Sequence, residues 1–132
     1  AKGNQHFYIW NKEGQLLEFI DAHHAQNTLS MSEDKAFLYY ESADHRLVKW
    51  SWKKGIPVTT FKSDTEPIMV INQEVKTGRL LTVNKTGMVT LWDDQGTLLQ
   101  SYPNQKMINA IFHKGLIIGL DQSLKLFYWE IE

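Results

Sequence analysis

The sequence predicts an all-β fold in which one antiparallel unit repeats along the chain, and two observations predict it. Short segments rich in Val, Ile, Leu, Tyr, Phe and Trp recur throughout the 132 residues, separated by Gly, Asn, Asp and Ser. In addition, Gly14, Gly55 and Gly96 stand 41 residues apart, and each follows a Trp by four or five residues. Self-similarity at a period of this length is typical of architectures built by stacking one supersecondary unit.

Each period accommodates four strands. The repeated Gly supplies the positive φ that a tight hairpin turn requires. Two further apolar segments lie between successive hairpins, as in Ile68 to Asn72 and Gly78 to Val83. Four short strands in about 41 residues are the unit of a β-propeller blade. We therefore expect a single domain over 1–132, an incomplete ring of four-stranded antiparallel blades, with blade pieces at about 1–20, 21–61, 62–102 and 103–132.

The third strand of each unit carries a recognisable pattern. Residues 86–93 read Thr-Gly-Met-Val-Thr-Leu-Trp-Asp and end in the Trp-Asp pair that names the WD-repeat family. Residues 44–51 keep an Asp six residues before Trp50, and residues 121–128 keep the Asp with Phe127 at the Trp position. On these segments nearly the whole chain resembles a WD-repeat β-propeller in degenerate form.

The resemblance implies a hydrogen-bonded set inside one blade, formed by His23 (or the adjacent His24), Ser42, Asp44 and Trp50. An imidazole N–H can donate to the turn carboxylate, and the indole N–H can donate to a hydroxyl. The other blades carry different residues at the corresponding positions. We therefore expect those blades to rely on packing.

Composition excludes several function classes. Lys plus Arg is 14 and Asp plus Glu is 15, which argues against a nucleic-acid binder because such proteins usually carry a basic excess. The apolar runs are too short for membrane insertion. The absence of cysteine fits the cytoplasm or the periplasm, and we take the cytoplasm as the expected compartment.

The sequence offers little chemistry for catalysis or metal binding. His23 and His24 are adjacent, so on a strand they point to opposite faces, and no Cys is available as a further ligand. Ser42, Asp44 and His45 contain the residue types of a catalytic triad but fall in one turn without a nucleophile elbow. We expect no cofactor, no metal, no catalytic residue and no enzymatic activity.

The favoured function is a scaffold or interaction module that mediates protein–protein assembly. In the family that the chain resembles, partners dock mainly on the loops that enter each blade and on those that join its second and third strands. Trp52 is an additional aromatic beside Trp50, and an exposed Trp is a good interface anchor. The expected protein-contact residues are His45, Arg46, Trp52, Asp64, Lys85 and Tyr102.

The incomplete ring implies a partner that completes it, either another chain or the rest of a longer propeller. The alternative function is a propeller-type enzyme or small-ligand binder that uses the central channel. Such a protein needs acids or His on the innermost strands. The segments 28–32, 68–72 and 108–112, which we expect there, contain none.

Overall fold

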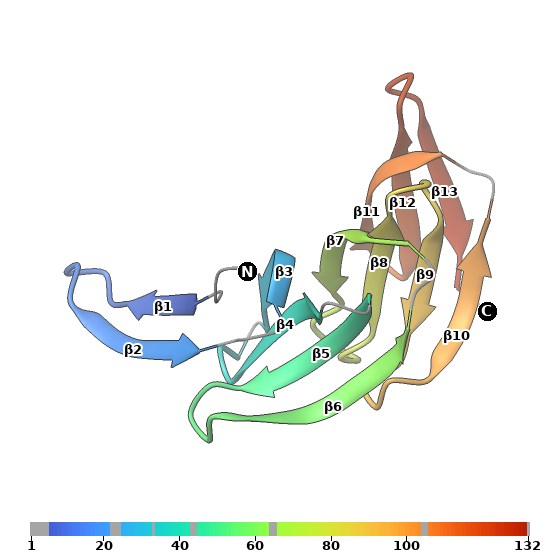
Figure 1. The fold of residues 1–132 in the computed structure, drawn as a ribbon. Helices are drawn as coiled ribbons and strands as arrows, with labels where there is room; N and C mark the ends of the chain where they lie inside the picture. Colours follow the sequence, from blue (N-terminus) through green and yellow to red (C-terminus); the bar gives the residue numbers. More distant parts are fainter. Residues whose placement is uncertain are drawn as a thin grey trace.

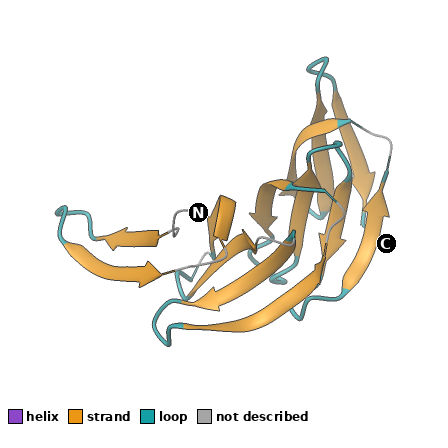
Figure 2. Ribbon diagram, viewed as in Figure 1, coloured by secondary structure: helices purple, strands orange, loops and turns teal. Residues whose placement is uncertain are grey.

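A computed structural model of the chain describes residues 6–21, 25–32, 34–42, 45–63, 66–103 and 106–131. Over these ranges the chain forms strands and loops only (Figure 2), and the all-β prediction is confirmed. The described strands number thirteen.

The strands form four antiparallel sheets, numbered here in chain order, and in each sheet neighbours in sequence pair with one another. Sheet 1 contains β1 (His6–Trp10) and β2 (Leu16–Asp21). Sheet 2 contains β3 (Ala25–Met31), β4 (Phe37–Ser42), β5 (Arg46–Ser51) and β6 (Ile56–Ser63). Sheet 3 contains β7 (Ile68–Gln73), β8 (Leu80–Asn84), β9 (Val89–Trp92) and β10 (Leu98–Tyr102). Sheet 4 contains β11 (Met107–His113), β12 (Leu116–Asp121) and β13 (Leu126–Glu130).

The four sheets follow one another as an open fan (Figure 1). Strand β7 contacts both β3 and β11, so the first strands of sheets 2, 3 and 4 lie next to one another on the inner side. Sheet 1 lies at one end of the fan and sheet 4 at the other. The arrangement is that of consecutive propeller blades in an unclosed ring, which confirms the predicted fold class.

Apolar side chains fill the space between sheets 3 and 4. One face of sheet 3 presents four aliphatic side chains, which are at most 1% exposed: Leu81, Val83, Val89 and Leu91. Sheet 4 covers them with Met107, Ala110 and Ile117. Burial of this kind is the main force that holds blade to blade.

The interface between sheets 2 and 3 follows the same plan. Tyr39, Leu47 and Phe61 of sheet 2 form a buried cluster with residues of sheet 3 that include Leu80 and Trp92. The rings of Phe61 and Trp92 meet edge to face, with centroids 5.6 Å apart. At the next interface Tyr102 of β10 meets Trp129 of β13 at 5.1 Å. At both interfaces, an aromatic residue on the last strand of one sheet contacts the third-strand Trp of the following sheet.

A buried hydrogen bond strengthens sheet 3. The indole N–H of Trp92 donates to the hydroxyl of Thr82 at 3.0 Å, and both side chains are at most 2% exposed. Trp92 faces Leu80 across the ladder, so the indole reaches diagonally to the residue two positions along β8. This blade was expected to rely on packing, and the hydrogen bond adds a polar contact to the packing around Trp92.

Gly87 connects sheets 3 and 4. Its carbonyl accepts the backbone N–H of Met107 at 3.1 Å, at the start of β11. Gly87 has φ +87°, and a Cβ there would lie 2.6 Å from the backbone nitrogen of Met107. Only glycine fits this position, because a side chain would strain the backbone and collide with the segment that enters the next sheet.

We predict that Gly87→Ala lowers the unfolding free energy by about 3 kcal/mol, since it adds a backbone clash to left-handed strain. Gly55→Ala is the matched control: Gly55 has φ +70°, but no atom lies within 4 Å of the position that a Cβ would occupy. The control should cost about 1 kcal/mol, the strain alone. Urea unfolding measures both, and equal losses in the two variants would contradict the clash at Gly87.

We predict that Thr82→Val lowers the unfolding free energy by about 2 kcal/mol, because it leaves the buried indole N–H of Trp92 without an acceptor. In a Trp92→Phe background the same substitution should cost about 1 kcal/mol less. Chemical denaturation of the two single variants and the double variant gives this coupling. Strict additivity would show that the hydrogen bond contributes nothing.

Candidate interaction surfaces

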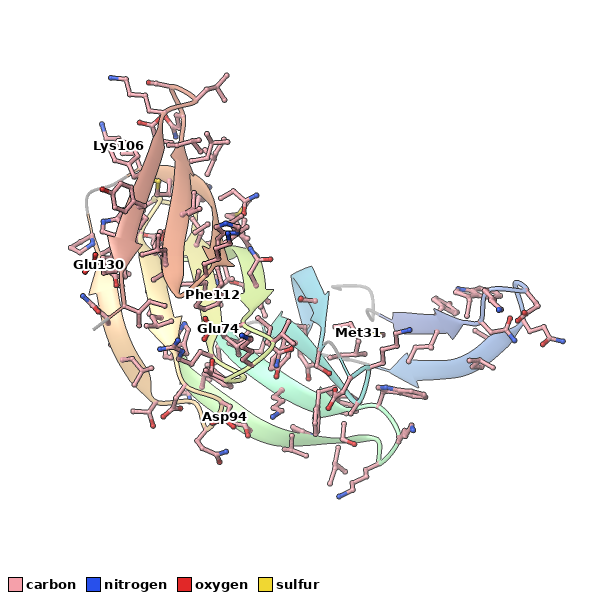
Figure 3. All side chains as sticks on the ribbon, turned by 180° about the vertical axis from the view of Figure 1, so that it is seen from behind. Met31, Glu74, Asp94, Lys106, Phe112 and Glu130 are labelled. Carbon is pink, nitrogen blue, oxygen red and sulfur yellow. The ribbon has the colours of Figure 1, made fainter. Side chains whose placement is uncertain are left out.

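The loops of the fan gather on two opposite rims. Among the described residues, the first rim contains His45 before β5, the turns β8–β9 and β12–β13, and residues 66–67 and 106, which precede β7 and β11. The second rim consists of the remaining turns, which lie at the other ends of the same strands. Figure 3 shows Lys106 of the first rim and Asp94 of the second at opposite ends of the sheets.

Side-chain caps hold two of the first-rim turns, β8–β9 and β12–β13, in shape. The side-chain oxygen of Asn84 accepts the backbone N–H groups of Thr86 and Met88 at 3.1 and 3.0 Å. Asp121 does the same for Ser123 and Lys125, at 2.9 Å in both cases. Turns fixed in this way present neighbouring side chains from a rigid support.

His45 and Arg46 lie on the first rim, at the turn β4–β5. Nδ1 of His45 lies 3.4 Å from a carboxylate oxygen of Glu41. Glu41 is buried and accepts the backbone N–H of Ile68 in sheet 3. His45 therefore flanks a structural link between two sheets, whereas Arg46 is exposed.

Lys85 lies on the same rim at the turn β8–β9. Its side chain is exposed, and its backbone N–H donates to the carbonyl of Pro67 at 2.8 Å. The fold thus places three of the sequence-predicted contact residues, His45, Arg46 and Lys85, on one rim.

Trp52 lies on the second rim, away from that group. Its indole N–H donates to the carbonyl of Lys35 at 2.6 Å, and the ammonium of Lys53 lies 5.6 Å from the ring centroid. The ring is partly buried. A partner that contacts Trp52 therefore approaches a different end of the sheets.

Tyr102 does not lie at the surface, where we expected it. It is 9% exposed and packs against Trp129 inside the interface of sheets 3 and 4. The reason is that the side chain at the end of β10 turns toward the following sheet rather than toward the rim. Asp64 lies outside the described residues.

The expected four-residue network is described only in part, because His23 and Asp44 lie outside the described residues. Ser42 is buried, and the buried indole nitrogen of Trp50 has no hydrogen-bond partner in the described part of the chain. At the position that Thr82 holds in sheet 3, sheet 2 has Tyr40, whose ring centroid lies 6.2 Å from that of Trp50. The network stays a prediction.

A polar groove of about 380 Å³ opens on the second rim between sheets 2 and 3. Burial, followed by the carboxylates of Asp34 and Asp94, raises the pKa of Tyr39 to about 12, and its hydroxyl accepts the amide N–H of Gln73 at 3.1 Å. A hydrogen bond from the hydroxyl of Ser32 lowers the pKa of the Asp34 carboxyl. The same groups thus join the sheets and line the groove.

Two apolar sheet faces at the ends of the fan were not singled out from the sequence. Tyr8 and Trp10 on sheet 1 are 53% and 58% exposed, and Leu126 and Tyr128 on sheet 4 are each 72% exposed. A signal was present, because 7–10 and 126–129 are apolar at every position rather than at alternate ones. Such runs indicate strands that are covered on both faces.

The described residues contain no cluster of three or more His, Cys, Asp or Glu side chains with metal-binding geometry. Within the same ranges, no helix has the length and hydrophobicity needed to cross a bilayer.

We predict that Tyr39 makes stability depend on pH in the alkaline range. Its folded-state pKa of about 12 lies above the ordinary value of 10.0, so the neutral phenol stabilises the fold below pH 10 and this contribution is lost as pH rises toward 12. Between pH 9 and 11 the wild-type unfolding free energy should fall by about 1 kcal/mol more than that of Tyr39→Phe. Denaturant titration at each pH measures the difference, and parallel pH profiles would contradict it.

No protein-family model matches the sequence, and neither does any curated protein. Among solved structures, the chain is similar to the computationally designed Ika4 protein, with a TM-score of 0.74, 17% identity, and coverage of 95% of this chain and 79% of that one. It is similar to the computationally designed Ika8 protein, with a TM-score of 0.75, 17% identity, and coverage of 94% and 39%. The RRP9 WD40 repeats give a TM-score of 0.70, 11% identity, and coverage of 82% and 36%.

The chain therefore spans about two fifths of the Ika8 chain and just over a third of the RRP9 repeat chain. At these identities the likeness concerns the fold. The chain has a β-propeller-like fold, shared with WD40 repeats and present here as an open set of blades.

Proposed function

We propose that the chain is a non-enzymatic, WD-repeat-like scaffold that mediates protein–protein assembly as part of a larger or oligomeric propeller. The observation that carries this proposal is the pair of exposed apolar faces at the two ends of the fan, marked by Trp10 and Leu126. Contiguous apolar surface of this kind marks an interaction site in folded proteins.

A second contact region is the first rim, which carries the cation of Arg46 at the start of β5 and that of Lys85 on the capped turn β8–β9. We propose that a protein partner with acidic groups contacts these two side chains, with His45 beside them. Asp64 and Trp52 stay candidate contacts, and Trp52 belongs to the second rim. Exposed charges of this type act mainly on the rate and the salt dependence of association.

The alternative, an enzyme or small-ligand binder in a central channel, needs polar groups that are free to meet a ligand. On the inner strands the amide of Asn72 donates to the carbonyl of Ala110 at 2.5 Å. Asn72 therefore links β7 to β11. Because the Asn72 amide is used in this hydrogen bond, the contact favours a structural role for the inner strands over ligand binding.

We predict that Arg46→Ala combined with Lys85→Ala reduces partner capture at least tenfold, because both cations face the proposed partner from one rim. The measurement is affinity capture with the purified chain as bait, at low and at physiological salt, with quantitative mass spectrometry of the retained proteins. The control variant, Lys54→Ala with Lys76→Ala, removes two exposed cations from the second rim and should retain the partner. Equal capture by both double variants would reject the rim assignment.

A further inference from the structure

The outward face of sheet 4 has the chemistry of a blade interface. Ile118 lies opposite Tyr128 across the ladder, and Leu120 lies opposite Leu126. Ile118, Leu120 and Leu126 line an apolar depression of about 200 Å³ on this face together with Ile111. Within the described part of the chain, no later sheet covers it.

The same positions in sheet 3 show what covers such a face. There the corresponding pairs are Leu81 with Leu91 and Val83 with Val89. The correspondence is fixed by the turn caps, because Asn84 and Asp121 each accept N–H groups two and four residues later. The four side chains of sheet 3 are at most 1% exposed, since sheet 4 packs on them.

The opposite end of the fan carries the complementary face. The rings of Tyr8 and Trp10 stack on one face of sheet 1, with centroids 6.4 Å apart and planes at 23°. Sheet 4 has the same pair, Phe127 and Trp129, at 6.4 Å and 16°. In sheet 4 this is the face turned toward sheet 3, as the contact of Trp129 with Tyr102 shows.

Charge at the margins of the two end faces is also complementary. Lys12 follows β1 in the turn to β2, on the second rim, and Glu130 ends β13 on the same rim. When sheet 1 of one fan packs on sheet 4 of another, Lys12 of the first fan and Glu130 of the second lie on the same rim.

We propose, on the basis of the proposed function, that the partner is a second copy of this chain, bound head to tail. The Tyr8–Trp10 face of one copy covers the face of the other copy that contains Ile118, Leu126 and Tyr128. A second copy fits because one chain carries both halves of the interface, each exposed. Two copies also supply eight sheets, within the range of about four to eight blades in closed propellers, and a head-to-tail contact can close into a ring.

The test uses the purified chain and one variant for each end. Trp10→Glu disables the sheet 1 face and Leu126→Glu disables the sheet 4 face, and we expect both variants to fold because both positions are exposed. Multi-angle light scattering should give twice 15.4 kDa for the wild type and 15.4 kDa for each variant alone, with affinity reduced at least about 30-fold. Val75→Glu, which alters an exposed apolar residue on a second-rim turn, is the matched control and should remain dimeric.

The decisive experiment is to mix the two variants. Each retains the face that the other has lost, so an equimolar mixture should recover a heterodimer through one intact interface. A wild-type monomer at about 100 μM, association that survives in either variant alone, or a monomeric mixture would each overturn the proposal. Circular dichroism confirms that each variant is folded. A monomeric chain that still captures another protein would reject self-association while leaving the proposed function in place.

Discussion

The structure depends on one constraint: each internal sheet has two apolar faces, and both must be covered. Sheet 3 meets this constraint on both sides, with Trp92 turned toward sheet 2 and Leu81 toward sheet 4. A single sheet of this kind is not stable in water, because it exposes apolar surface on both faces. Blade stacking is therefore the source of stability, and it leaves an uncovered face at each end of the fan.

A few aromatic contacts and hydrogen bonds determine how neighbouring blades pack. The aromatic contact of Phe61 with Trp92 recurs as Tyr102 with Trp129, so both interfaces have the same register. Hydrogen bonds between neighbouring sheets also determine how the sheets are placed. The carboxylate of Glu41 accepts the backbone N–H of Ile68, and the carbonyl of Gly87 accepts the backbone N–H of Met107. Both links lie on the first rim, the rim that carries Arg46 and Lys85.

The repeat in the sequence predicted the sheets well, since the glycine turns follow from the geometry of a hairpin. In sheet 4, however, Trp129 rather than the expected Phe127 holds the position that Trp92 holds in sheet 3. Positions that depend on the neighbouring sheet were not predictable in the same way. Tyr102 ends a strand and was assigned to the surface, but its environment is set by Trp129 of the next blade. The bond from Trp92 to Thr82 was missed because it joins diagonal positions of two strands. Runs apolar at every position, such as 126–129, did contain the signal for the end faces.

Site-directed cross-linking tests most directly whether the two end faces cover one another. It suits this chain because the sequence contains no cysteine. One copy carries Lys12→Cys and the other Glu130→Cys, so the apolar anchors remain intact. A short bismaleimide should join the two variants into a mixed dimer in preference to either like pair. Equal yields of all three cross-linked pairs, or no cross-linked product, would contradict head-to-tail coverage of the sheet faces.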